Sequence, residues 1–349
     1  MRNIWPPTSI IEGDKSFGTK RLPFSHTLTY LSSDPKMLPL GLGVSFRDGW
    51  ILSRVNPNLD RGGGARHFRQ IHRYTYSCQR HFRSTHHLDE SLALCNYLNK
   101  TMSAESAARA ITAGCLDRYP EGVAYGGSRR RNELWELLAS TLLRFEDDCD
   151  MIVDLLVGIQ TLPSMNSNPW WVTDPQPSDS LCELPSFHNV WQSCYESLRC
   201  QCHEGEDESF SVDKNYYRRA GKAEAKMYLR GIPGITEFMG YKTINLICVQ
   251  NEDLEFVIHE IHGWLQTAGS KLAETLDSNK IKFFEREVRG RPGKYYDVSV
   301  TMFEHWQHWK KSFLEISFDE HLLSSEGRGL ARECHDIMKA QNIKLPFFL

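Results

Sequence analysis

The stretch Asn132–Ile159, NELWELLASTLLRFEDDCDMIVDLLVGI, carries the strongest helical pattern in the chain. Its apolar residues recur at intervals of three to four residues or of a double turn, at Leu134, Leu138, Leu142, Phe145, Ile152 and Leu156. That period places one apolar face along a helix. We therefore predict one long helix over this stretch, with the acidic run Glu146–Asp150 at its centre.

Helical patterns continue on both sides of this stretch. Residues 187–198 form another candidate helix, residues 251–287 read as one long helix, and residues 298–323 read as the last one. Almost no segment alternates with the period of a strand. We predict an all-α fold with a single helical domain over residues 46–349, and an extended N-terminal segment, residues 1–45, that packs on the core.

Composition and charge narrow the class of protein. The chain has 349 residues, and 40% of them are hydrophobic, which is enough to bury a sizeable core. Its 41 Lys and Arg residues against 44 Asp and Glu residues give a net charge of −3, which disfavours a nucleic-acid or acidic-membrane binder. No apolar run reaches the roughly 18 residues of a membrane span, and the N-terminus lacks a signal-peptide pattern. We expect a soluble, cytoplasmic protein, either a monomer or a homodimer.

Most of the ten cysteines are scattered singly along the chain, as expected for small buried side chains in a reducing compartment. Only Cys194, Cys200, Cys202 and His203 form a cluster. This cluster lacks the paired CxxC motifs of most zinc sites, so we favour a loop over a zinc site.

The acidic run Glu146-Asp147-Asp148-Cys149-Asp150 is the first candidate site. Glu146 and Asp150 stand one helical turn apart, and Asp147 lies three residues before Asp150, so the three carboxylates can point toward one spot. Unpaired negative charge in an apolar helix is costly, and Mg²⁺ favours a few carboxylates together with phosphate oxygens of a substrate. The alternative is a helix end that protrudes into water.

Two further features lie downstream. Arg230 directly precedes a helix break at Pro233 and Gly234, and a fixed cation beside freed backbone groups suits an oxyanion such as phosphate. Asn279 and Glu287 share one face of the long predicted helix and offer oxygen ligands to a metal, and Arg286 could reach a phosphate. An ordinary Pro-Gly break and an ordinary charged helix terminus are the structural alternatives.

Together these features resemble class I terpene synthases over roughly residues 130–315. That family carries a DDxxD-type motif, then an Arg diphosphate sensor with a Gly four residues later, and then an NDxxSxxxE motif. The matching residues are Glu146, Asp147 and Asp150 in the first motif, Arg230 and Gly234 in the second, and Asn279, Arg286 and Glu287 in the third.

The sequence departs from the family at several positions. Lys280 and Phe283 replace the usual Asp and Ser of the last motif, and no Arg-Tyr pair follows near the C-terminus. A second register for that motif, Gln266, Ser270 and Glu274, keeps the Ser and the Glu. Such eroded motifs are similar to those of atypical fungal sesquiterpene cyclases, including humulene synthases.

The resemblance implies a helical bundle around a central cavity and an enzyme that uses Mg²⁺, with three ions bound together with the substrate diphosphate. The implied reaction ionises farnesyl diphosphate and converts the allylic cation to a sesquiterpene hydrocarbon. It also implies catalytic roles for Arg230 and Gly234, metal ligation by Glu146, Asp147, Asp150, Asn279 and Glu287, and diphosphate binding by Arg230 and Arg286. Candidate cavity residues, for each of which plain core is the favoured alternative, are Phe145, Trp191, Trp306, Trp309 and Phe313.

Other functions stay open at this point. A degenerate helical protein that binds an isoprenoid diphosphate without catalysis would explain the lost Asp and Ser. A trans-prenyltransferase usually has a second Asp-rich motif, and none appears near Asp277. A metal hydrolase or haem protein could use His259 and His262 or the His86-His87 pair, although His259 and His262 lack the i, i+4 spacing of a zinc-peptidase helix.

Overall fold

The structure is a computed structural model that describes residues 45–55, 88–116, 126–162, 183–204, 214–249, 253–277, 279, 281–287, 295–341 and 343. The chain divides into two compact units, Met1–Leu38 and Pro39–Leu349, and every described residue belongs to the second. The predicted extended segment therefore lies outside the described residues, apart from Ser45.

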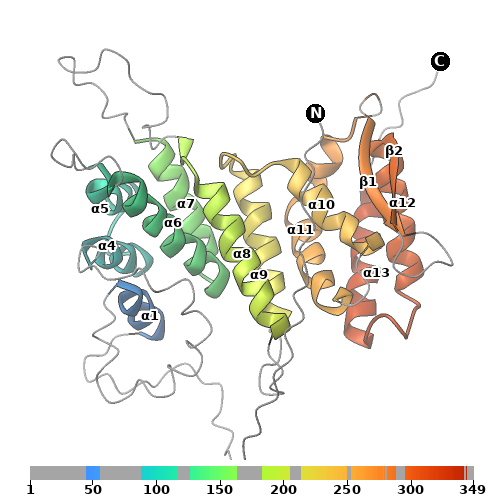
Figure 1. Cartoon of the computed structure of the whole chain (residues 1–349), viewed down its shortest axis with the longest axis horizontal. Coiled ribbons are helices and arrows are strands. Elements are labelled where there is room, and N and C mark those ends of the chain that lie inside the picture. The colour runs from blue at the N-terminus through green and yellow to red at the C-terminus, as the bar shows by residue number, and fades with distance from the viewer. Residues whose placement is uncertain are drawn as a thin grey trace, which may run out of the picture. The chain divides into compact units, whose positions relative to one another are not determined.

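Helices make up most of the described part of the chain (Figure 1). They are α1 (Phe46–Val55), α4 (Leu88–Leu98), α5 (Ala104–Leu116), α6 (Gly126–Arg144), α7 (Cys149–Gln160), α8 (Phe187–Glu204), α9 (Lys214–Leu229), α10 (Glu237–Val249), α11 (Leu254–Glu274), α12 (Met302–Ile316) and α13 (Ser325–Ala340). The strands in this part are β1 (Ile281–Glu287) and β2 (Tyr295–Thr301). The predicted all-α class is thus confirmed, whereas a bundle of the terpene synthase type stays a prediction.

The helix α11 packs against α9, α10 and α13. Its contact with α9 is very close at Gly221, where a Cβ atom would lie 2.2 Å from the backbone oxygen of Glu260. Only glycine therefore fits at that position of α9. None of the helices among the described residues is long and apolar enough to cross a membrane.

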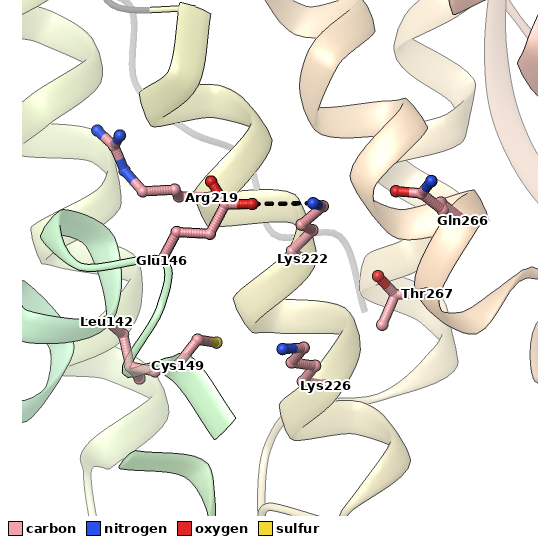
Figure 2. Close-up of a pocket in the computed structure, with 8 residues that line it drawn as sticks. All are labelled: Leu142, Glu146, Cys149, Arg219, Lys222, Lys226, Gln266 and Thr267. Carbon is pink, nitrogen blue, oxygen red and sulfur yellow. Dashed lines mark hydrogen bonds and ion pairs between the residues drawn. The ribbon is translucent and has the colours of Figure 1, made fainter. Parts of the chain in front are cut away.

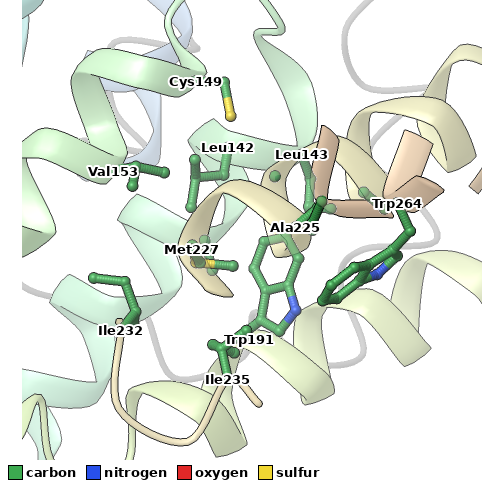
Figure 3. Close-up of a cluster of buried hydrophobic side chains, with 14 of the residues drawn as sticks. Leu142, Leu143, Cys149, Val153, Trp191, Ala225, Met227, Ile232, Ile235 and Trp264 are labelled. Carbon is green, nitrogen blue, oxygen red and sulfur yellow. The ribbon is translucent and has the colours of Figure 1, made fainter. Parts of the chain in front are cut away.

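A cluster of buried side chains fills the space where α6, α7, α8, α9 and α11 meet (Figure 3). Trp191 of α8 and Trp264 of α11 lie side by side within it. Both indole N–H groups donate to the carboxylate of Glu224, each over 2.9 Å. Glu224 is only 9% exposed, and burial raises its pKa against the opposing effect of the two indole donors.

The single long helix predicted for residues 132–159 is wrong. The structure has two helices, because α6 ends at Arg144 and α7 begins at Cys149, with the acidic run at the junction. Asp148 occupies the N-cap position of α7, and Asp150 lies in its first turn. The side chain of Asp148 makes no capping hydrogen bond, so these two carboxylates favour the start of α7 through their negative charge at the positive end of the helix dipole.

The long helix predicted for residues 251–287 is also wrong in its last part. The helix α11 ends at Glu274, and residues 281–287 form β1, which pairs antiparallel with β2, with Phe283 opposite Ser299 and Phe284 opposite Val298. Side chains alternate along β1, so Phe284 is buried while Phe283 is 66% exposed. Residues 295–301, YYDVSVT, are β-branched or aromatic at five of seven positions, which favours a strand.

Two other boundaries differ from expectation. The last long helix was predicted from residue 298, but α12 starts at Met302, because Thr301 and Glu304 form a capping box that fixes its N-terminus. The cysteine-containing segment that was predicted as a loop belongs to α8, which continues to Glu204.

Candidate functional site

Three carboxylates from Glu146 onward each pair with a cation of α9 or of its C-terminal end. The pairs are Glu146–Lys222, Asp150–Lys226 and Asp154–Arg230. In every pair the partners are 76 residues apart in the sequence. The contact therefore advances by four residues on each segment from pair to pair, so the segment from Glu146 through α7 runs in the same direction as α9. We call these three pairs the ion-pair ladder.

Glu146 has the most contacts in the ladder. Its carboxylate accepts hydrogen bonds from Lys222 over 2.9 Å and from Arg218 over 3.2 Å. Burial alone would raise the pKa of Glu146, but the bond from Lys222 and the charges of Arg218 and Lys222 outweigh burial, so the pKa is lowered. Glu146 is thus a stable anion that two cations already neutralise.

The other two pairs face solvent more openly. Lys226 lies 2.7 Å from Asp150, whose side chain is 76% exposed. Arg230 pairs with Asp154, and both side chains are about half exposed. Exposed ion pairs contribute only about 0–1 kcal/mol to stability, so these contacts are weak and easily exchanged.

The remaining members of the acidic run point elsewhere. Asp147 is exposed and has no ion pair with any described residue. Asp148 is 8% exposed and pairs with Arg47 of α1 over 2.8 Å. Burial raises the pKa of Asp148 against the opposing charge of Arg47. Phe145, a candidate cavity residue, packs edge-on against Trp50 of α1 with ring centroids 5.3 Å apart.

These positions test whether the acidic run fits a magnesium ion. Glu146 and Asp150 are each held by cations of α9, and Asp147 lies in solvent without joining them. Within the described ranges, no three His, Cys, Asp or Glu side chains come together as a metal site would require. In this arrangement the predicted ligands do not fit Mg²⁺, which needs several oxygens around one point.

The helix break after Arg230 lies where it was predicted. The helix α9 ends at Leu229, and Gly231 and Gly234 both have positive φ angles, 68° and 81°. A Cβ atom on Gly234 would lie 2.7 Å from the Cβ atom of His188, at the start of α8. Backbone conformation and close approach thus both require glycine at position 234.

Beside the ladder lies a pocket of about 240 Å³. It is lined by Leu142, Glu146, Cys149, Arg219, Lys222, Lys226, Gln266 and Thr267. Figure 2 shows Lys222 and Lys226 one above the other along α9, with Glu146 and Cys149 on one side and Gln266 and Thr267 on the other. Three cations and one carboxylate line this space, so it favours an anion.

Sequence analysis identified Arg230 but missed the lysines of this site. Lys222, Lys226 and Arg230 repeat every fourth residue, as Glu146, Asp150 and Asp154 do. Two complementary series with the same helical spacing were the available signal, since they predict a row of pairs if the two helices lie parallel. Arg219 lines the pocket as well and donates from Nε to the backbone oxygen of Leu143 over 2.9 Å.

The second predicted metal motif does not lie on a helix. Asn279 precedes β1, and Arg286 and Glu287 belong to this strand, which packs against α10 and α12. Arg286 donates to Nδ1 of His305 over 3.1 Å, and His305 is fully buried. Arg286 therefore contacts α12, whereas the carboxylates of the ladder contact α9.

Of the three residues in the alternative register of that motif, one lines the pocket. Gln266 of α11 lines the pocket, whereas Ser270 is exposed and Glu274 pairs with Lys271 over 2.9 Å. Thr267, which belongs to neither register, also lines the pocket.

The other candidate cavity residues lie in the hydrophobic core. Trp191, Trp306, Trp309 and Phe313 are each at most 1% exposed. Trp309 donates from its indole N–H to Asn245 of α10 over 2.8 Å, which fixes α12 against α10. None of these four side chains lines the pocket beside the ladder.

Comparison of the chain with protein-family models, with curated proteins and with solved structures found no match.

Proposed function

We propose that this protein is a class I terpene cyclase that ionises farnesyl diphosphate beside the ion-pair ladder. The resulting carbocation loses a proton to the departed diphosphate, and a sesquiterpene hydrocarbon and protonated diphosphate are released. The observation that supports this proposal is the pairing of Asp154 with Arg230, directly before the break at Gly234. It brings the acidic segment and the predicted diphosphate sensor together beside a pocket that favours anions.

The chemistry of ionisation explains why such a site needs cations. When the carbon–oxygen bond of an allylic diphosphate breaks, negative charge accumulates on the departing diphosphate, and positioned cations stabilise it. Enzymes lower barriers by about 8–23 kcal/mol, whereas one cation–π contact contributes about 2 kcal/mol. The Lys and Arg side chains of α9 would therefore contribute to bond cleavage, and aromatic side chains would only guide the carbocation afterwards.

The second candidate is a protein that binds an isoprenoid diphosphate without turning it over. Two observations favour it: Arg286 of the second predicted motif contacts α12 instead of the ladder, and the carboxylates of the first motif are already paired with cations. Both candidates use the same anion-binding pocket, so they differ only in whether product forms.

Incubation of the purified full-length chain with C10, C15 and C20 isoprenoid diphosphates, followed by gas chromatography–mass spectrometry, tests the proposal. We expect a C15 hydrocarbon that is lost in Arg230→Ala and retained in Lys271→Ala, a control on the exposed face of α11. Parallel reactions with Mg²⁺ and with EDTA, and with Asp147→Ala, test the metal dependence that the resemblance implies. Absence of product from all three substrates would exclude the cyclase and leave the second candidate.

A further inference from the structure

The pocket beside the ladder is small. Its volume of about 240 Å³ lies below the range of about 300–1,000 Å³ of pockets that enclose a drug-sized ligand. It is therefore the right size for a compact polar group rather than for a whole C15 chain. A diphosphate group is such a group, because it is compact and rich in hydrogen-bond acceptors.

The walls of the pocket match an anion with several acceptor oxygens. On one wall, α9 presents Lys222 and Lys226 one turn apart, with Arg219 nearby. On the opposite wall, α11 presents the amide of Gln266 and the hydroxyl of Thr267. Ammonium, guanidinium, amide and hydroxyl groups all donate hydrogen bonds, so phosphate oxygens would find donors on both walls.

Lys222 and Lys226 can exchange their present carboxylate partners for a bound anion at little cost in free energy. If Lys226 turns to a phosphate group, Asp150 is left in water, because its side chain is already 76% exposed. If Lys222 does so, Glu146 still keeps its bond from Arg218. Neither carboxylate becomes buried and unpaired, which is the arrangement that would be costly.

On these grounds we infer that the pocket is a diphosphate subsite in which Lys222 and Lys226 leave the ion-pair ladder and bind the anion directly, without a bridging Mg²⁺ ion. This inference rests on the proposed function for the isoprenoid nature of the ligand. It assigns Glu146 a further role, as the carboxylate that competes with the ligand for Lys222.

Calorimetric titration of the full-length chain with inorganic pyrophosphate in EDTA tests the inference directly. We expect binding in EDTA, and binding about 10- to 100-fold weaker in Lys222→Gln and in Lys226→Gln, because each variant loses a charge-assisted hydrogen bond to the anion. The matched control Lys271→Gln removes an exposed, paired lysine of α11 and leaves the affinity unchanged. Circular dichroism of each variant verifies that it is folded.

Glu146→Gln gives the sharpest result, because it removes the competitor of the ligand. We expect this variant to bind pyrophosphate more tightly than the unmodified chain, a change that simple loss of structure cannot produce. Weaker binding in Glu146→Gln would overturn the inference, as would unchanged binding in both lysine variants. Equal affinity for inorganic phosphate and pyrophosphate would overturn the assignment to a diphosphate.

The outcomes separate this inference from the proposed function. Pyrophosphate binding in EDTA with no hydrocarbon product supports the subsite and excludes the cyclase. A hydrocarbon product with no pyrophosphate binding in EDTA supports the cyclase and overturns the direct binding by lysine.

Discussion

On two faces of the helix α9, carboxylates lie in opposite environments, one partly in water beside cations and the other buried beside neutral donors. On one face, Lys222 and Lys226 meet Glu146 and Asp150, and these charges are partly in water. On the other face Glu224, only two residues from either lysine, is buried and held by neutral donors alone. The first face can exchange partners cheaply, whereas the second cannot change a partner without leaving a buried polar group unsatisfied.

The largest effect is expected on the buried face. Glu224→Ala leaves the indole N–H groups of Trp191 and Trp264 buried without an acceptor and creates a cavity, so we expect a loss of about 2–4 kcal/mol in the free energy of unfolding. Urea unfolding followed by tryptophan fluorescence measures it. A loss below about 0.5 kcal/mol would show that the two faces do not differ as described.

The pH dependence of stability gives a second readout of the same residue. Burial raises the pKa of Glu224 above its ordinary value of 4.5, so the folded chain keeps a proton that the unfolded chain releases. The stability that depends on Glu224 is thus fully present below pH 4.5 and is lost as the pH rises through the raised pKa. In Glu224→Gln this part of the pH dependence should disappear.

The next effect concerns the break that follows α9, beyond the face that carries Lys222 and Lys226. Gly234→Ala combines a positive φ angle with a contact of 2.7 Å to His188, so we expect a loss of about 1–3 kcal/mol in the free energy of unfolding. Gly231→Ala is the matched control, because it has a similar φ angle but no atom within 4 Å of the added Cβ. Thermal unfolding should therefore rank Gly234→Ala as the less stable variant, and the reverse order would contradict the close approach to α8.

The elements that the sequence could predict are those with local signals. The apolar spacing of Leu134, Leu138 and Leu142 lies within one helix, and the Pro-Gly pair at residues 233–234 marks a break by its own conformational limits. Both predictions hold in the structure. They need no knowledge of what lies beside them.

The candidate site was only half predictable, since its partners are distant in the sequence. The carboxylates Glu146 and Asp150 were identified from their spacing, but their cations lie 76 residues further along the chain. Spacing alone shows which side chains share a face and does not show what that face meets. A metal ion and a row of lysines can satisfy the same carboxylates, and it is tertiary packing that brings Lys222 and Lys226 beside them.

The strand pair β1–β2 was not predicted, for a related reason. Residues 281–287 contain charged residues that also suit a helix, and their strand conformation depends on pairing with residues 295–301. The alternation of exposed Phe283 and buried Phe284 becomes meaningful only once that partner strand is in place. Because this pairing is non-local, a reading of residues 251–287 as one helix missed it.

The smallest effect is expected on the face of α9 that carries Lys222 and Lys226. Asp150→Asn removes the charge that Lys226 meets at 2.7 Å, yet the carboxylate is 76% exposed, so we expect a change of at most about 0.5 kcal/mol in the free energy of unfolding. Salt screens such pairs, so any difference from the unmodified chain should shrink further between low and high ionic strength. Urea unfolding at two salt concentrations measures both quantities. A loss above about 1.5 kcal/mol that persists in high salt would mean that the ladder holds α7 and α9 together, and Lys226 could then not leave it cheaply for an anion.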